Sequence, residues 1–218
     1  MSVHESLKGV YNCLYDRYGP QRWWPADEPF EVIVGAILTQ STAWVNVEKA
    51  IANLKNAEVL NPASLRQLPI DDLAALIKPS GYYNVKAHKL KALVERLDDF
   101  NDILSDMLSP DVPQLRNELL SIYGIGPETA DSIILYAAQK PIFVIDAYTH
   151  RIMGRLGLNP TSDSYTGLQS FFMDNLPHDE RFFNEYHALL VRHGKEVCKK
   201  SSPLCIDCCL TEYCRFSS

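Results

Sequence analysis

The stretch 115–138, LRNELLSIYGIGPETADSIILYAA, has the pattern of two short helices joined by a tight glycine turn. The turn is Tyr123-Gly124-Ile125-Gly126, and both glycines can adopt positive φ and leave the backbone open to a phosphate. Pro127 suits the first turn of the second helix, where exposed amides and the positive helix end favour an anion. With Thr129 in that turn, the stretch predicts a contact with a nucleic-acid backbone. A plain helix–helix connection is the alternative.

Apolar residues recur at helical spacing along most of the chain, and proline and glycine residues punctuate the pattern. Residues 30–39, FEVIVGAILT, are apolar enough for a buried strand as well. We expect a buried helix there, because no neighbouring run supplies a strand partner. The fold class is therefore predicted to be all-α. The expected helices are 2–18, 30–39, 42–54, 71–77, 84–98, 113–121, 127–138, 146–156, 164–174 and 181–193.

The composition is that of an ordinary globular protein, with 46% hydrophobic and 22% charged residues in 218. This composition excludes a mainly disordered chain. A membrane-spanning helix is excluded as well, since no run of 18 apolar residues occurs. The N-terminus has no apolar signal core, so we expect a cytoplasmic protein, associated with the nucleoid if the source is bacterial.

The formal charge is −6, from 21 basic and 27 acidic residues, so any DNA binding must come from a local patch. Residues 191–202 hold four basic side chains against one acidic one. Lys199 and Lys200 are the predicted contacts to the DNA backbone in this patch. A solvated helix end is the alternative.

Five of the six cysteines lie in the last 21 residues. Cys198, Cys205, Cys208 and Cys214 are separated by six, two and five residues. Four thiolates in one short loop can hold an iron–sulfur cluster or a zinc ion, and a reducing cytoplasm disfavours disulfides. We favour the cluster, because zinc ribbons usually show two CxxC pairs; buried cysteines without metal are a third alternative. Cys209 could replace Cys208, although the two-residue spacing favours Cys208.

Asp146 follows an apolar run, residues 142–145, at an expected helix start. A carboxylate in that position is most often an N-cap. The functional alternative is a desolvated carboxylate that activates water or stabilises a cationic transition state.

Taken in order, the hairpin, Asp146 and the cysteine loop resemble the helix–hairpin–helix DNA glycosylases of the endonuclease III type, from about Trp23 to Cys214. The resemblance implies two helical domains. The first is a six-helix barrel at 22–133 with the helix–hairpin–helix at 115–138. The second combines 1–21 with 134–218 and carries a [4Fe–4S] loop at 198–214. It also implies that Asp146 is catalytic and that the partner is double-stranded DNA with a damaged base; we expect a monomer.

Two motifs depart from the endonuclease III pattern. Bifunctional members carry a lysine that forms a Schiff base two residues after the second hairpin glycine, and this chain has Glu128 there. A carboxylate cannot form an imine, so strand cleavage by that route is not expected. The usual Asp-Thr-His is Asp146-Ala147-Tyr148, while Arg151 keeps the family's arginine.

The chain is also similar to the 3-methyladenine glycosylases of this superfamily, through the segments WWP (23–25), GAILTQ (35–40), Trp44, PSGYYN (79–84) and HGK (193–195). This similarity implies a monofunctional enzyme that flips out and excises alkylated purines. The indoles of Trp24 and Trp44 would attract a cationic base, with Trp23 and Lys195 as further pocket residues. Gln40 would enter the gap left in the duplex.

Other interpretations stay open at this point. The tryptophans could be core residues and Gln40 a surface residue. The enzyme could be an endonuclease III-like glycosylase for oxidised or mismatched bases with lyase activity. It could also be an iron–sulfur DNA-binding protein without catalysis.

Overall fold

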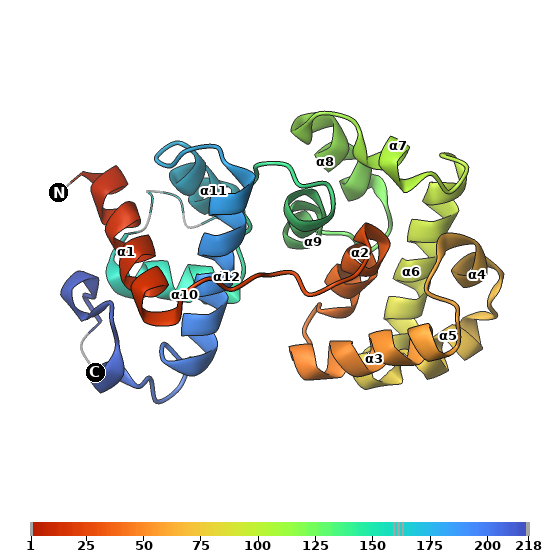
Figure 1. The fold of residues 1–218 in the computed structure, drawn as a ribbon, viewed down its shortest axis with the longest axis horizontal. Coiled ribbons are helices and arrows are strands. Elements are labelled where there is room, and N and C mark those ends of the chain that lie inside the picture. The colour runs from red at the N-terminus through yellow and green to blue at the C-terminus, as the bar shows by residue number, and fades with distance from the viewer. Residues whose placement is uncertain (1, 159, 161, 163, 217–218) are drawn as a thin grey trace. The chain divides into compact units, whose positions relative to one another are not determined.

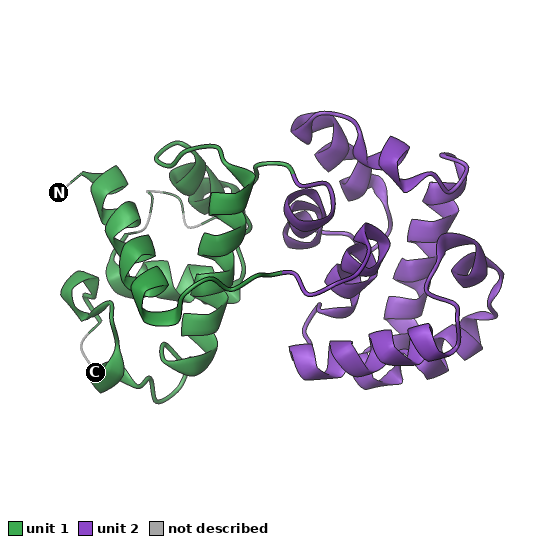
Figure 2. Ribbon diagram, in the orientation of Figure 1, with its two compact units in different colours: residues 1–23, 140–218 green, residues 24–139 purple. Residues whose placement is uncertain are grey.

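The computed structural model describes residues 2–158, 160, 162 and 164–216, and all regular secondary structure in these residues is helical (Figure 1). The all-α prediction is therefore confirmed. No helix in the described residues is long and apolar enough to cross a membrane. The chain forms two compact units, which Figure 2 colours separately: unit 1 combines residues 1–23 with 140–218, and unit 2 comprises residues 24–139.

Unit 2 is built around α2 (Pro29–Leu38), whose residues from Phe30 to Leu38 are all buried. This helix packs against α3, α6 and η2, so the apolar run at 30–39 is a helix enclosed by other helices rather than a strand. The remaining elements are α3 (Trp44–Asn56), α4 (Pro62–Gln67), α5 (Ile70–Leu76), η1 (Lys78–Ser80), α6 (Tyr83–Asp98), α7 (Leu104–Leu108), α8 (Val112–Ser121), α9 (Pro127–Ser132) and the π-helical η2 (Ile133–Ala137).

Unit 2 ends later than the sequence boundary at residue 133. The unit continues to Gln139, and η2 packs against α2, α8 and α9 within it. The ring of Tyr136 on η2 also lies 5.4 Å from that of Trp24. The helix expected over 127–138 is likewise divided into α9 and the π-helical turn. A π-helix inserts one residue into the helical repeat and rotates the following side chains, which hydrophobic periodicity does not reveal.

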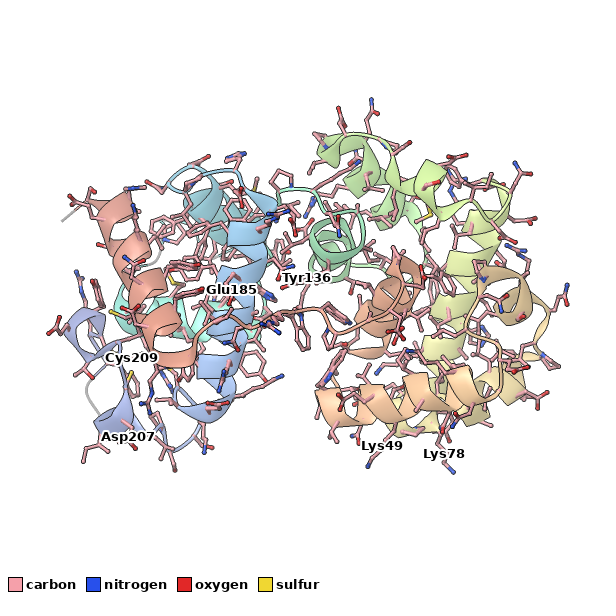
Figure 3. The ribbon with its side chains drawn as sticks, in the orientation of Figure 1. Lys49, Lys78, Tyr136, Glu185, Asp207 and Cys209 are labelled. Atoms are coloured by element: carbon pink, nitrogen blue, oxygen red, sulfur yellow. The ribbon has the colours of Figure 1, made fainter. Side chains whose placement is uncertain are left out.

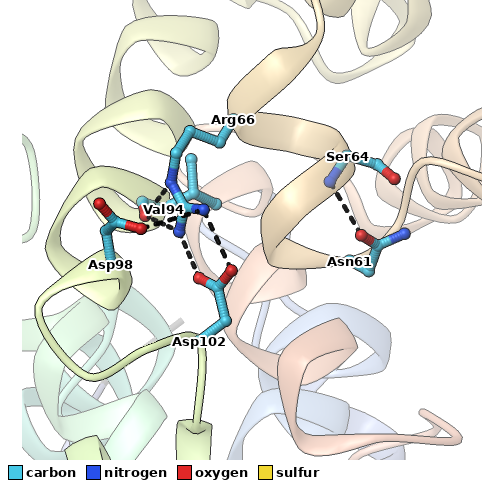
Figure 4. Close-up of polar contacts among 6 residues, drawn as sticks. All are labelled: Asn61, Ser64, Arg66, Val94, Asp98 and Asp102. Carbon is cyan, nitrogen blue, oxygen red and sulfur yellow. Dashed lines mark hydrogen bonds and ion pairs between the residues drawn. The ribbon is translucent and has the colours of Figure 1, made fainter.

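The short helix α4 was not expected, although its start has a recognisable signal. Asn61 caps it by accepting the Ser64 amide at 2.9 Å, and Pro62 occupies its first turn. Arg66 fastens α4 to the end of α6 (Figure 4). Its guanidinium donates to the Val94 carbonyl at 2.7 Å and forms a two-pronged ion pair with Asp102.

Unit 1 joins the two ends of the chain, since α1 packs on α12. Its core is aromatic: Phe143 stacks on Phe172 at 3.9 Å, and the buried Tyr186 donates its hydroxyl to the Leu7 carbonyl at 2.8 Å. The elements of unit 1 are α1 (Val3–Tyr18), α10 (Ala147–Leu156), α11 (Tyr165–Met173), α12 (Glu180–Glu196), η3 (Cys205–Asp207) and η4 (Thr211–Tyr213).

Candidate active site

The two glycines of the hairpin between α8 and α9 differ in backbone conformation and in how far their surface is covered. Gly124 has φ +83°, as expected, but Gly126 is extended at φ −94° and caps α9. Gly126 therefore does not use the positive φ that a glycine can adopt. The stem of Lys89 covers Gly124, whereas a Cβ placed on Gly126 would meet nothing within 4 Å. Ile125 is 5% exposed and anchors the turn in the core, so Gly126 is the position that an outside group can approach.

A buried ion pair locks the two hairpin helices together. Arg116 on α8 donates from Nε to Asp131 Oδ1 at 2.7 Å and from Nη2 to Oδ2 at 3.2 Å. The Asp131 side chain is fully buried. Because both carboxylate oxygens are engaged, the pair fixes the angle between the helices as well as their separation.

Gln40, which follows α2, lies against this hairpin. Its Nε2 donates to the Gly124 carbonyl at 3.0 Å and to the Thr129 hydroxyl at 2.9 Å, and Lys89 donates to its Oε1. Three residues predicted to contact DNA are thus brought together. Thr129 is buried with its hydroxyl engaged, so its side chain supports the hairpin from within.

A buried lysine that sequence reasoning missed orders the turn after α2. Lys86 is 2% exposed and donates to the carbonyls of Leu38 and Ser80 and to the Thr42 hydroxyl, at 2.7–2.8 Å. Burial, with a smaller contribution from the charge of Lys89, lowers the pKa of Lys86 to about 8. A lysine on an amphipathic helix is normally solvated, so its spacing carried no signal.

The loop held by Lys86 presents an exposed aromatic side chain. Tyr82, between η1 and α6, is 74% exposed and adopts a left-handed conformation at φ 45°. Such a backbone is strained for a tyrosine, and the neighbouring hydrogen bond of Thr42 to the Ser80 carbonyl helps to hold the loop. The sequence feature that could have pointed to Tyr82 is its position directly after Gly81, in a glycine turn.

Trp24 and Trp44 line one cavity of about 220 Å³ in unit 2. Their rings are 5.1 Å apart and nearly perpendicular, at 87°, so they do not form two parallel walls around a base. Trp24 is packed against Gly35 and against Tyr136, which Figure 3 labels. Trp44 is therefore the ring on which a planar ligand could stack in this geometry.

The same cavity has acidic walls. Glu31 and Glu48 line it, and the only cation in the lining is Lys55. Lys55 is held by two carboxylates, with Nζ 2.8 Å from both Glu31 and Asp27. The cavity lining includes neither Trp23 nor Lys195, both of which belong to unit 1. Aromatic faces and excess negative charge both favour a positively charged ligand.

Asp146 caps α10, and only one of its oxygens is used in doing so. Oδ1 accepts the Thr149 amide at 2.7 Å, while Oδ2 lies 3.7 Å from Nε2 of His187 on α12. The two side chains are 11% and 8% exposed. The N-cap interpretation is thus correct, and it leaves the second oxygen of a nearly buried carboxylate for another task.

Lys195 and Arg151 both lie close to the Tyr148 ring. Lys195 Nζ is 6.0 Å and Arg151 Cζ 5.1 Å from its centroid. Arg151 also donates to the carbonyls of Gly194 and Cys198, both at 2.9 Å. It therefore ties α10 to the end of α12, where the cysteine loop begins.

Four of the five clustered cysteines form one electrostatic group. Burial raises the pKa of the Cys208 thiol, and the charges of Cys198, Cys214 and Cys205 raise it further. Cys209, labelled in Figure 3, behaves differently: burial raises its pKa to about 11, with contributions from Cys208 and from Cys13 on α1.

Donors from the surrounding helices reach this group. Arg155 Nη1 lies 3.2 Å from Cys198 Sγ, and His193 Nε2 lies 3.5 Å from Cys208 Sγ. Arg155 also donates to the carbonyls of Lys199 and Lys200, at 2.8 and 3.2 Å, while the two lysine side chains face solvent.

The donor set suits an iron–sulfur cluster. Four neighbouring thiols ionise together only where positive charge compensates them, and N–H donors to the sulfurs are typical around such clusters. Each cysteine of a [4Fe–4S] cluster binds a different iron, so the sulfurs surround the cluster rather than one ion. In the described part of the chain, no three Cys, His, Asp or Glu side chains are grouped closely enough to share a single metal ion.

Comparisons with known proteins agree with this geometry. Residues 34–178 match the family model for HhH-GPD superfamily base excision DNA repair proteins. The chain is 44% identical over 212 residues to the candidate DNA repair glycosylase MJ1434 of Methanocaldococcus jannaschii, covering 96% of each protein. It is 32% identical over 192 residues to endonuclease III of Thermotoga maritima, covering 87% of this chain and 84% of that one.

Two solved structures extend the comparison. The 3-methyladenine DNA glycosylase of H. pylori, bound to 1,N6-ethenoadenine, has a TM-score of 0.77 at 29% identity and covers 90% of this chain and 98% of that one. A non-covalent endonuclease III–DNA complex has a TM-score of 0.84 at 24% identity, covering 99% and 96%, and shows the shared fold. The chain therefore belongs to the HhH-GPD superfamily of base excision DNA repair proteins, and it is a DNA glycosylase, which hydrolyses N-glycosidic bonds.

Proposed function

We propose that this glycosylase is monofunctional and excises positively charged N-alkylated purines such as 3-methyladenine from duplex DNA. The observation that carries the proposal is the cavity of unit 2, which combines the indoles of Trp24 and Trp44 with the carboxylates of Glu31 and Glu48. The likeness to the H. pylori 3-methyladenine glycosylase over 98% of that chain supports it.

The leaving base needs little activation by the enzyme. An N-alkylated purine already carries positive charge, so its glycosidic bond is weak and the base departs as a neutral molecule without further protonation. Positive charge then develops on the sugar. We assign its stabilisation, or the orientation of the attacking water, to Asp146, whose capping bond to Thr149 holds the carboxylate in place.

We assign DNA binding to two surfaces. On unit 2, the turn Gly124-Ile125-Gly126 with Thr129 beneath it would contact the backbone, while Gln40 and Tyr82 would enter the duplex. For Gln40 to do so, its amide must exchange its hydrogen bonds to the hairpin for bonds to bases. On unit 1, the exposed Lys199 and Lys200 would contact phosphates, and Lys195 and Trp23 would lie near the substrate.

Alkylated, oxidised and mismatched bases can be told apart with a panel of lesion duplexes. Wild type is expected to excise 7-methylguanine and 3-methyladenine faster than the neutral hypoxanthine or an oxidised pyrimidine. Trp44→Ala should lower excision of the cationic bases by about 5- to 160-fold, as expected for about 1–3 kcal/mol per lost stack. Glu48→Gln should lower it selectively, and Glu58→Gln, a nearby exposed control outside the cavity lining, should not. Equal losses on cationic and neutral bases would contradict the charge-based selectivity.

Borohydride trapping tests the monofunctional chemistry. Glu128 is exposed in the first turn of α9, where a Schiff-base lysine would be required, so no covalent protein–DNA adduct is expected. A bifunctional lyase treated in parallel shows that trapping works. A strong adduct that disappears in Lys140→Ala or Lys195→Ala would show that another lysine attacks the sugar.

We also propose that Cys198, Cys205, Cys208 and Cys214 hold a [4Fe–4S] cluster. The loop has few apolar residues to hold it in place. A bound cluster would cross-link it through the four thiolates and so contribute free energy to its folding. The Cys209 thiol, which interacts with Cys13, is left out of this ligand set.

The cysteine assignment predicts a contrast between neighbouring residues. The protein should purify brown, with the broad visible absorption of an iron–sulfur cluster. Cys205→Ala should bleach it and make the segment after α12 sensitive to protease, whereas Cys209→Ala should keep both colour and protection. Stoichiometric zinc in a colourless, anaerobically prepared protein would contradict the cluster, and bleaching by Cys209→Ala would contradict the ligand set.

A further inference from the structure

Asp146 faces a histidine that no sequence pattern pointed to. His187 lies in the middle of α12, and its Nε2 is 3.7 Å from Asp146 Oδ2 at the start of α10. The His187 side chain is 8% exposed, and α10 and α12 pack against each other. The separation is longer than a hydrogen bond but within reach of one after a small rotation, and such contacts often shorten when substrate binds.

The two carboxylate oxygens of Asp146 have different partners. Oδ1 is fixed by the Thr149 amide, so Oδ2 is the oxygen left to act on the sugar or on water. We propose that His187 is a positioning residue for Asp146, which in its neutral form fixes the direction of Oδ2 and leaves the negative charge of the carboxylate intact. This inference rests on the catalytic role proposed above for Asp146.

The surroundings of His187 favour the neutral imidazole. Burial lowers its pKa, the charge of Lys195 on α12 lowers it further, and the charge of Asp146 opposes both. His187 is therefore uncharged near neutral pH. If it gains a proton in acid, a positive charge beside Oδ2 neutralises the carboxylate that the reaction needs. Excision should then fall as the pH drops below the usual histidine range.

Single-turnover excision of 7-methylguanine between pH 4.5 and 8 tests this role, because a cationic base needs no proton in order to leave. We expect His187→Gln to slow excision about tenfold at pH 7.5 and to remove the fall in rate on the acid side of the profile. His88→Gln, an exposed histidine of α6, is the matched control and should keep the wild-type profile. Circular dichroism establishes that each variant is folded.

An NMR titration gives a second readout that does not depend on activity. In Asp146→Asn the pKa of His187 should be lower than in wild type, since the carboxylate that raises it is gone. An unchanged His187 titration would overturn the inference, and so would a slower His187→Gln variant that keeps the wild-type pH profile. Failure of wild type to release any alkylated base would instead overturn the proposed function, which separates the two.

Discussion

Asp146→Asn is expected to bind lesion-containing DNA as wild type does and to excise the base at least 10²-fold more slowly. Asparagine keeps the shape and the capping oxygen for the Thr149 amide but removes the negative charge. The magnitude is that of losing one preorganised electrostatic group, about 10²–10³ in rate. Single-turnover kinetics combined with a gel-shift titration measures the two quantities separately.

Asp179→Asn is a matched control for this experiment. Asp179 caps α12 of the same unit in the same way, with its carboxylate accepting the Phe182 amide at 2.8 Å. It should excise like wild type, because it shares the capping role without the catalytic one. Wild-type excision by Asp146→Asn would reduce Asp146 to a helix cap.

Asp131→Ala is expected to cause a large loss of stability in the hairpin. It leaves Arg116 without its two-pronged partner. Breaking a fully buried pair costs about 3–5 kcal/mol in free energy of unfolding, and because the Arg116 side chain is 25% exposed, water offsets part of this and leaves about 2–3 kcal/mol. For a chain of 218 residues this corresponds to a fall in Tm of roughly 4–12 °C. Differential scanning calorimetry measures it directly.

Asp102→Ala provides the comparison, because Asp102 forms the same kind of pair with Arg66. The two arginine side chains are equally exposed, at 25%, whereas the Asp102 side chain is 29% exposed and that of Asp131 is fully buried. Solvent screens that pair, so its loss should cost about 1 kcal/mol or less. Equal shifts in Tm for the two variants would show that burial of the carboxylate does not set the strength of the Arg116–Asp131 ion pair.

The sequence was most informative where a feature could be predicted from residues that are close together in the chain. Asp146 was predicted to be a helix cap because it follows an apolar run at a helix start, and the structure confirms the cap. The spacing of Cys198, Cys205, Cys208 and Cys214 was likewise a property of one short segment. The buried helix over 30–39 was predicted from the absence of a neighbouring strand, and α2 confirms it.

What the sequence did not reveal depends on contacts between distant segments. Lys86 and His187 are polar residues on amphipathic helices, and only packing shows that they are buried. The acidic walls of the cavity come from Glu31 and Glu48, whose shared surface requires α2 and α3 to be docked. The extended backbone of Gly126 is set by its role as the cap of α9, although a glycine could adopt either sign of φ.

Chromatography of the bases released from methylated duplex DNA tests the central claim most directly. Wild type should release free 3-methyladenine or 7-methylguanine in single-turnover amounts, and the strand should break only after alkali treatment. Asp146→Asn should release little or none. Release of oxidised pyrimidines alone, with strand cleavage in the absence of alkali, would contradict a monofunctional glycosylase for alkylated purines.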